Sequence, residues 1–229
     1  MIESVNVIGA RGRVGSAMSA RLAERDVELR REGAALVLLC VPDRAIAQVA
    51  AELEPGPWVA HVSGGTPLAA LDPHVARFSL HPLQTFTLGR GPEQLDGAWA
   101  AVTGETEAAV ETATSLAETL GLRPFPLADE SRALYHAGAA IASNYVVTLR
   151  RAAGELLAAA GAPAGALDPL MRRVIENEFQ LTGPIERGDW ETVERHRSAI
   201  AAVAPDLLEA YDALATLTAR DAIAQGSRT

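Results

Sequence analysis

The sequence contains the stretch Ser4-Val5-Asn6-Val7-Ile8-Gly9-Ala10-Arg11-Gly12-Arg13-Val14-Gly15, in which a short apolar strand pattern runs directly into a glycine-rich turn. Residues 14–25 then show the four-residue spacing of apolar side chains that is typical of a helix. Glycines let the backbone bend tightly there, so that a pyrophosphate can approach the amides of the helix N-terminus. The stretch predicts a dinucleotide-binding turn in which Arg11 and Arg13 either pair with phosphate or stay solvated. The alternative is a tight strand-to-helix connection without a ligand.

The segments downstream of this turn alternate between strand and helix patterns. Residues 35–41 are nearly all apolar, as expected of a parallel strand covered on both faces, and Asp43 is placed to cap a helix that runs to residue 53. Further predicted elements are strands at 58–62, 76–80, 98–103 and 122–125 and a helix at 105–120. Strands that alternate with helices predict an α/β fold with a parallel, doubly wound sheet.

The pattern changes near residue 129, after which no strand signal appears. Helical patterns cover residues 131–160, 166–180, 189–203 and 205–224. We therefore expect an α/β domain over residues 1–128 and an all-α domain over residues 129–229. The helices are rich in alanine and bury little area each, so we expect them to need close packing or a second subunit.

The segment between Gly15 and Ala35 is short for a dinucleotide-binding fold. Such a fold usually places an acid or an arginine about 20 residues after the turn, at the end of its second strand. This segment has room for the first helix and a short polar link, so the second and third strands are expected to be missing or vestigial. The candidates for contact with the ribose or a 2′-phosphate are Glu28, Arg30, Arg31 and Glu32. The alternative is that each of these side chains is a solvated loop charge.

Composition narrows the classes of function. The chain has 229 residues and a net charge of −9, and its 20 basic residues are all arginine. Without lysine, the chain cannot form a Schiff base, use a lysine general acid or build a P-loop. An acidic chain without a basic cluster is not expected to bind nucleic acid.

The remaining composition points to a soluble cytoplasmic protein. Cys40 is the single cysteine, so neither an internal disulfide nor a cysteine metal site can form, and we expect a buried structural thiol. The N-terminal residues lack the pattern of a signal peptide, and no apolar run approaches the length needed to cross a bilayer. Metal binding is not expected, because no ligand spacing such as His-x-x-x-His occurs.

Polar clusters follow three of the predicted strands. The clusters are Pro42-Asp43, His61-Val62-Ser63-Gly64-Gly65 and His81-Pro82-Leu83-Gln84-Thr85-Phe86. Ligands of open parallel sheets bind beyond the carboxyl ends of the strands, where these clusters are expected to meet. His81 is the first candidate for proton transfer, with a structural hydrogen-bonding role as the alternative. His61 ends a buried strand and is expected to be a satisfied core or capping residue.

The helical half also carries polar side chains in unusual places. His136, Ser143, Asn144 and Tyr145 interrupt a helix of small residues, which points to a cleft or to a subunit contact. Residues 182–189 form a turn in which Arg187 could clamp a substrate carboxylate.

Several motifs in one order carry a resemblance to a known family. They are Gly-Ala-x-Gly-Arg-Val-Gly, Val41-Pro42-Asp43, His61-x-Ser63-Gly64, Ser79-Leu80-His81-Pro82-Leu83-Gln84-Thr85-Phe86, Ala142-Ser143-Asn144-Tyr145 and Leu181-Thr182-Gly183-Pro184-Ile185-x-Arg187-Gly188-Asp189. Together they closely resemble the bacterial proteins that pair a Rossmann-like domain with domain of unknown function 2520. That group is similar to the 6-phosphogluconate dehydrogenase-like superfamily, which includes ketopantoate, pyrroline-5-carboxylate and prephenate dehydrogenases or reductases.

The resemblance implies NAD or NADP as cofactor, a helical dimerisation domain, and a substrate cleft between the domains. The His81-Pro82 segment looks like the His-Pro segment of prephenate dehydrogenases, which implies that His81 is the acid–base residue and that Asn144 orients substrate or nicotinamide. The lysine acid of ketopantoate reductases has no counterpart here.

The expected activity is that of an NAD(P)-dependent oxidoreductase acting on a small carboxylate-bearing ketone, alcohol or imine. The alternatives are a non-catalytic ligand-binding or regulatory dimer, or a turn that holds a mononucleotide, a flavin-like cofactor or a phosphorylated metabolite. The candidate cofactor-binding residues are Gly9, Ala10, Arg11, Gly12, Arg13, Val14, Gly15, Val41, Pro42, Asp43 and Ser63. The candidate substrate-binding residues are Gln84, Thr85, Ser143 and Arg187.

Overall fold

A computed structural model describes residues 2–226. The chain divides into two compact units, residues 1–143 and 144–229. The sequence predicts that the helical domain starts at residue 129, where the 3₁₀ helix η3 (Asp129–Ser131) leads into helix α4 (Arg132–Ala140). The first unit nevertheless includes this helix, because side chains from its first turn are bound to the sheet.

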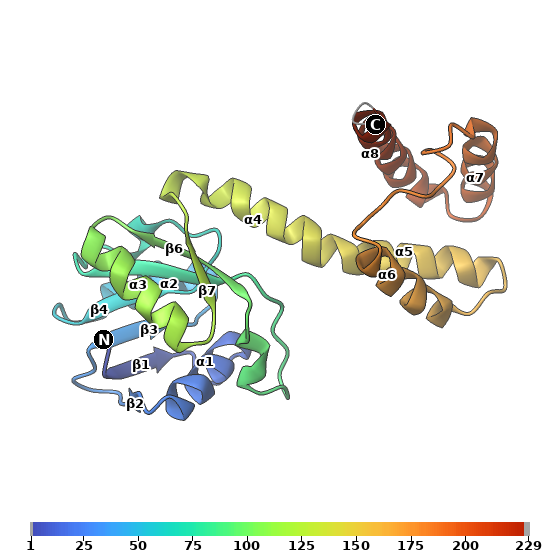
Figure 1. The fold of residues 1–229 in the computed structure, drawn as a ribbon. Coiled ribbons are helices and arrows are strands. Elements are labelled where there is room, and N and C mark those ends of the chain that lie inside the picture. The colour runs from blue at the N-terminus through green and yellow to red at the C-terminus, as the bar shows by residue number, and fades with distance from the viewer. Residues whose placement is uncertain (1, 227–229) are drawn as a thin grey trace. The chain divides into compact units, whose positions relative to one another are not determined.

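The first unit is built on a seven-stranded sheet in the order β2-β1-β3-β4-β5-β6-β7 (Figure 1). The strands are β1 (Ser4–Ile8), β2 (Glu28–Leu29), β3 (Leu36–Leu39), β4 (Trp58–His61), β5 (Arg77–Pro82), β6 (Trp99–Gly104) and β7 (Arg123–Pro126). Short apolar runs form the central strands β3 and β4, and both are buried between layers of helix. The predicted α/β fold class is confirmed.

The alternation of strands and helices predicts a parallel sheet, but the observed sheet is only partly parallel. Strand β6 pairs with β5 antiparallel, and β7 is parallel to β6, so both of these strands run opposite to the other five. The connection over residues 83–98 holds only the short 3₁₀ helix η2 (Pro92–Leu95). An antiparallel neighbour needs no crossover helix, so the chain returns directly to the edge that it left.

The shortened segment after the glycine turn contains one two-residue strand. In β2, Glu28 is in register with Ser4 and Leu29 with Val5. The Arg30 amide extends the pairing by donating to the Val5 carbonyl at 3.2 Å. Among the described residues, the sheet ends at this strand, so one short strand lies beyond β1 where a full dinucleotide fold has two.

Helices cover both faces of the sheet, as expected of a doubly wound fold. Helices α1 (Arg13–Glu24) and α3 (Glu107–Thr119) contribute side chains such as Met18 and Leu116 to the larger apolar core. Helix α2 (Asp43–Ala51) and the 3₁₀ helix η1 (Leu68–Leu71) cover the other face with a second core. Both layers leave the carboxyl ends of β1, β3, β4 and β5 at one edge.

The helical part follows the sequence pattern closely. Helix α4, the π-helical turn η4 (Ile141–Tyr145) and helix α5 (Val146–Ala159) are consecutive in the chain. The remaining helices are α6 (Leu167–Glu176), α7 (Trp190–Val203) and α8 (Leu208–Gly226). Within residues 2–226, no helix is both long enough and apolar enough to cross a membrane.

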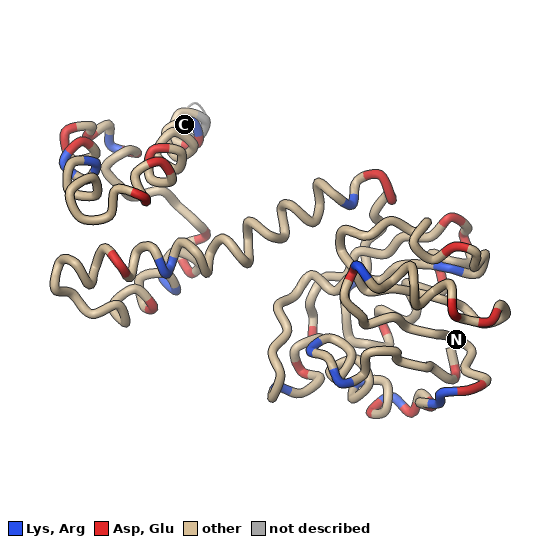
Figure 2. Tube along the Cα trace, turned by 180° about the vertical axis from the view of Figure 1, so that it is seen from behind, with Lys and Arg blue, Asp and Glu red and all other residues tan. Residues whose placement is uncertain are grey.

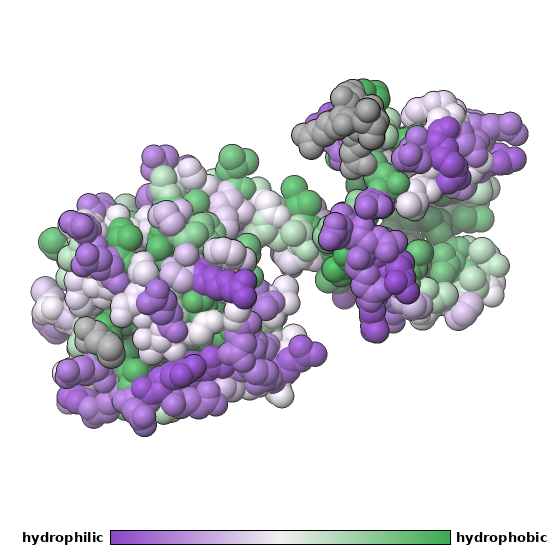
Figure 3. Space-filling model, in the orientation of Figure 1, coloured by the Kyte–Doolittle hydropathy of each residue, from purple (hydrophilic) through white to green (hydrophobic). Residues whose placement is uncertain are grey.

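The second unit leaves many large apolar side chains exposed. Examples on α5 and α6 are Val147, Leu149, Leu170 and Ile175. Between Arg132 and Arg150 the helical segment carries no charged side chain (Figure 2). Figure 3 shows apolar side chains on the visible surface of α5. That these helices pack against a second subunit stays a prediction made from the sequence.

Candidate functional site

The glycine turn at the end of β1 leaves no room for side chains at two positions. Gly9 has φ +93°, and a Cβ atom there would lie 2.3 Å from the Cys40 carbonyl oxygen. A Cβ atom on Gly15 would lie 2.3 Å from the Gly9 carbonyl oxygen. The turn closes through a hydrogen bond of 2.9 Å from the Gly12 amide to the Gly9 carbonyl. The turn therefore depends on glycine for packing as well as for backbone freedom.

The turn also leaves the N-terminus of α1 open. Gly12 occupies the N-cap position without a capping side chain, and the first turn of α1 holds no acidic residue. Arg11 and Arg13 are exposed on the same turn, while Val14 packs against the core. Free helix amides, the helix dipole and nearby arginines favour an anion, so the turn fits the phosphates of a dinucleotide.

The next two strand ends lie beside this turn. Val41 packs on the second core, Pro42 is the N-cap of α2, and Asp43 is its exposed first residue. After β4, the Ser63 hydroxyl donates to the Thr66 hydroxyl at 2.8 Å and accepts from the Thr66 amide at 3.0 Å. The Ser63 side chain therefore shapes the loop of residues 63–66.

His81, near the end of β5, is held on two sides. Its Nδ1 lies 2.7 Å from the hydroxyl of Tyr135 on α4, and the two rings meet edge to face. On the other side, a Cβ atom on Gly64 would lie 2.9 Å from His81 Nε2 and 3.0 Å from the His136 ring. His81 Nε2 makes no hydrogen bond to any residue between 2 and 226. This nitrogen is therefore available to a ligand.

The surroundings of His81 keep its imidazole neutral. Burial, and then the positive charges of His136 and Arg132, lower the pKa of His81 to about 4, although Asp43 opposes the shift. Burial raises the pKa of Tyr135 to about 12, so its phenol keeps the proton. At neutral pH the pair consists of an uncharged imidazole and an uncharged phenol.

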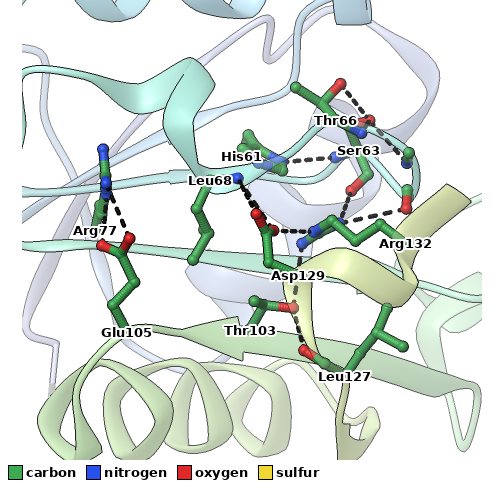
Figure 4. Close-up of polar contacts among 12 residues, drawn as sticks. His61, Ser63, Thr66, Leu68, Arg77, Thr103, Glu105, Leu127, Asp129 and Arg132 are labelled. Atoms are coloured by element: carbon green, nitrogen blue, oxygen red, sulfur yellow. Dashed lines mark hydrogen bonds and ion pairs between the residues drawn. The ribbon is translucent and has the colours of Figure 1, made fainter.

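A buried arginine joins the loop after β4 to helix α4 (Figure 4). Arg132 is 1% exposed, and its guanidinium donates to the Ser63 carbonyl at 3.0 Å and the Gly64 carbonyl at 3.3 Å. Nε donates to Asp129 at 2.8 Å, and Nη2 donates to the Thr103 hydroxyl on β6 at 3.4 Å. One side chain thus positions the loop that contacts His81 and the helix that carries its partner.

The sequence predicts structural roles for His61 and Cys40, but His61 is satisfied only in part, because its buried Nε2 has no hydrogen-bond partner within residues 2–226. His61 is fully buried, and its Nδ1 accepts from the Ser63 amide at 3.2 Å (Figure 4). Burial, followed by the charge of Arg132, lowers the pKa of His61 to about 3. Cys40 is partly buried, and burial raises the pKa of its thiol to about 12. A protonated thiol is a weak nucleophile, which agrees with a packing role.

The predicted substrate residues are less confined. Gln84 and Thr85 are exposed after β5, and the side-chain Oε1 of Gln84 accepts from the Thr85 amide at 2.8 Å. The Ser143 hydroxyl donates to the Ala139 carbonyl at 2.7 Å, and Asn144 follows it in the π-helical turn. Arg187 belongs to the second unit and donates to the Thr182 carbonyl at 2.7 Å. The first unit thus brings together the glycine turn, Asp43, Ser63 and His81.

Sequence reasoning missed the roles of Arg132 and Tyr135. Both lie in a helical stretch in which the sequence draws attention instead to polar residues farther along the chain. A charged residue followed by 17 uncharged positions in the sequence is a signal that Arg132 has a buried partner. No comparable signal pairs Tyr135 with His81, because 54 residues separate them.

The strand order, the glycine turn and the following helices define a Rossmann-like fold. Protein TM1727 from Thermotoga maritima has a TM-score of 0.80 at 24% identity, over 99% of this chain and 100% of that chain. BF3122 from Bacteroides fragilis, described as a candidate NADP oxidoreductase, has a TM-score of 0.78 at 19% identity, over 96% and 98%. The 1-pyrroline-5-carboxylate reductase of Streptococcus pyogenes has a TM-score of 0.61 at 15% identity, over 93% and 97%. At these identities the likeness shows the fold.

The family follows from the sequence itself. The family model described as Domain of unknown function (DUF2520) matches residues 98–218, which is more than half of the chain. The chain therefore belongs to this family, and the resemblance read from its motifs is confirmed. No curated protein matches the chain.

Replacing Arg132 by methionine should strongly destabilise the first unit. The substitution leaves Asp129 and the Ser63 and Gly64 carbonyls without their buried partner, which costs about 3–5 kcal/mol in the free energy of unfolding. Urea denaturation, followed by Trp58 and Trp99 fluorescence in a Trp190→Phe background, measures this. Arg77→Met is the control, because Arg77 pairs with the exposed carboxylates of Asp72 and Glu105 and should cost about 1 kcal/mol or less. Equal losses in the two variants would contradict the role given to Arg132.

Acidification should destabilise the first unit through His61 and His81. Folding lowers the pKa of His61 to about 3 and of His81 to about 4, from 6.5. Below pH 6.5 these histidines are protonated in the unfolded chain and stay neutral in the folded chain. The free energy of unfolding therefore falls by about 1.4 kcal/mol per pH unit for each histidine. His61→Gln, whose amide oxygen can still accept from Ser63, should remove one histidine's share of the slope between pH 6.5 and 4. Urea denaturation at several pH values measures the slope, and an unchanged slope would show that His61 is not the titrating group.

Proposed function

We propose that the protein is an NADP-dependent oxidoreductase in which His81 is the acid–base residue for a small carboxylate-bearing ketone, alcohol or imine. The observation that carries the proposal is one sheet edge at which an uncapped helix N-terminus and a histidine with a free Nε2 occur together. The structures of similar fold support it, because their descriptions include an NADP oxidoreductase and a 1-pyrroline-5-carboxylate reductase.

The phosphates of the cofactor would lie on the glycine turn. The open amides of α1 would receive the pyrophosphate, and the absence of side chains at Gly9 and Gly15 lets the backbone approach it. Arg11 and Arg13 would add positive charge at the same turn. When bound, the nicotinamide supplies or accepts the hydride.

The choice of NADP over NAD rests on two arginines. Arg30 and Arg31 directly follow β2, where dinucleotide folds contact the adenosine ribose. The Arg31 backbone is fixed beside β1, because the Asn6 side-chain amide donates to its carbonyl at 3.0 Å. Glu28 forms an ion pair with Arg30, so their charges offset each other and the pair would have to open for Arg30 to contact a phosphate. The segment is suited to a 2′-phosphate.

At the substrate end, the chain supplies orientation and a proton-transfer group. His81 would hydrogen-bond the reacting oxygen or nitrogen through Nε2, while Tyr135 contacts its Nδ1 and Gly64, held by Arg132, lies against its ring. Gln84 and Thr85, which follow His81 in the chain, would contact the substrate. Substrate contacts of Ser143, Asn144 and Arg187 stay predictions made from the sequence.

We further infer that the protein acts as a homodimer through its helical unit. The exposed apolar side chains of α5 and α6, together with the uncharged stretch between Arg132 and Arg150, support an apolar contact between copies. No membrane or nucleic-acid partner forms part of the proposal.

NADPH should bind the protein more tightly than NADH. Isothermal titration calorimetry measures both, and the Arg30→Ala/Arg31→Ala double variant should lose about 10- to 100-fold in NADPH affinity with NADH affinity unchanged, since it removes charge-assisted hydrogen bonds to the 2′-phosphate. Arg25→Ala, in the exposed residue after α1, is the control. If neither NADPH nor NADH shows saturable binding below millimolar concentration, the proposed dehydrogenase function is wrong and a non-catalytic ligand-binding or regulatory dimer is favoured.

Replacing His81 by asparagine should separate catalysis from binding. Loss of the proton-transfer group should lower turnover about 10²- to 10⁴-fold in NADPH oxidation assays with a panel of carboxylate-bearing ketones and imines. NADPH affinity should change less than about threefold, because the phosphates bind at the glycine turn. Equal losses of turnover and affinity would instead assign His81 a structural role.

A further inference from the structure

We propose that Tyr135 is the positioning residue for His81, and that its hydroxyl holds the imidazole in the tautomer that carries hydrogen on Nε2. The catalytic consequence rests on the function proposed above. The tautomer itself is a property of the protein alone and can be measured without cofactor or substrate.

The contact between the two side chains is fixed by packing on both sides. Tyr135 Oη lies 2.7 Å from His81 Nδ1, and the ring centroids are 5.5 Å apart at an interplanar angle of 85°. On its other side the Tyr135 ring meets Phe125 at 6.0 Å. One turn earlier in the helix, buried Arg132 binds the first turn of α4 to the sheet and to the loop after β4. The phenol therefore cannot swing away from His81 without a wider rearrangement.

The direction of this hydrogen bond follows from the chemistry of the two groups. A neutral imidazole offers one donor and one acceptor, whereas a phenol can do either. Within residues 2–226, Tyr135 Oη has no hydrogen-bond partner except His81. A phenol is a much stronger acid than a neutral imidazole N–H, and an imidazole nitrogen is a much stronger base than a phenol oxygen. The phenol therefore donates to Nδ1, and the hydrogen of the neutral imidazole is on Nε2, which has no partner among residues 2–226 and is free to bind a ligand.

The loop after β4 keeps that Nε2–H group accessible. Gly64 faces His81, and a Cβ atom there would lie 2.8 Å from Cε1 and 2.9 Å from Nε2. Any side chain at this position would press on the part of the ring that must meet a ligand. The backbone of Gly64 is held in place by its carbonyl, which accepts from Arg132 at 3.3 Å.

The tautomer narrows the substrate class of the proposed enzyme. An Nε2–H group donates a hydrogen bond and so recognises an acceptor, namely a carbonyl oxygen or an imine nitrogen. An alcohol presents its own hydrogen and needs a bare Nε2. The Tyr135–His81 pair therefore favours the ketone or imine among the three classes, with the developing negative charge on the reacting atom stabilised by the Nε2–H group. As that proton passes from Nε2 to the product, the phenol proton of Tyr135 passes to Nδ1, and the phenolate is reprotonated from solvent.

Nitrogen NMR of the full chain tests the tautomer directly. In protein labelled with ¹⁵N-histidine, a long-range ¹H–¹⁵N spectrum near pH 7 should show His81 with a protonated Nε2 and an unprotonated Nδ1, assigned by comparison with His81→Asn. Tyr135→Phe keeps the aromatic packing and removes the hydroxyl, so His81 should change to an averaged mixture of tautomers. Tyr211→Phe is the matched control, because Tyr211 contacts His196 at 2.9 Å in the second unit and should leave His81 unchanged.

Kinetics supply a second, independent readout. Tyr135→Phe should lower turnover about tenfold, which is the loss expected for one hydrogen bond, with NADPH affinity unchanged. A wild-type His81 that is protonated on Nδ1, or a tautomer that Tyr135→Phe leaves intact, would overturn the proposal. The wild-type spectrum decides this even if the variant does not fold.

The two proposals fail in different ways. If NADPH does not bind while the spectra change as expected, Tyr135 positions His81 but the dehydrogenase assignment is wrong. If NADPH binds and His81→Asn loses turnover while Tyr135→Phe changes neither the spectrum nor the rate, the positioning role alone is wrong.

Discussion

A guanidinium removed from water must have every donor directed at an acceptor, and much of the first unit depends on how Arg132 meets this requirement. Its partners come from the loop after β4, from β6 and from Asp129. Asp129 in turn accepts from the Leu68 amide at the start of η1. Satisfying one buried charge therefore fixes a loop, a strand, a 3₁₀ helix and the first turn of α4 relative to one another, and His81 lies among these elements.

The features that sequence predicts well are those set by neighbours in the chain. The turn Gly9–Gly15 was recognised because its glycines, strand and helix are contiguous, and the buried role of His61 followed from its place at the end of an apolar strand. The antiparallel return of β6 was missed because a pattern of strands and helices does not specify direction. Tyr135 was missed as the partner of His81 because that contact exists only after α4 packs on the sheet. Arg132 was missed because its acceptors lie on separate segments of the chain, and two of them are backbone carbonyls.

The site combines two kinds of electrostatic environment within one sheet edge. At the glycine turn, open amides and exposed arginines remain solvated and favour negative charge. Near His81, burial and the charge of Arg132 disfavour a further positive charge, so the imidazole stays neutral. A ligand with an anionic end and an uncharged polar end matches this division, because each part meets the surroundings that it needs.

Because β6 returns antiparallel, the segment next to His81 and the glycine turn are separate parts of the chain that can change independently in evolution. Residues 83–98 leave the edge directly after His81 and come back to the same edge at Trp99, without forming part of the glycine turn. Insertions and substitutions are tolerated best in such connections. Related chains can therefore vary residues 83–98, and with them the surface next to His81, while the glycine turn that faces the phosphates stays unchanged.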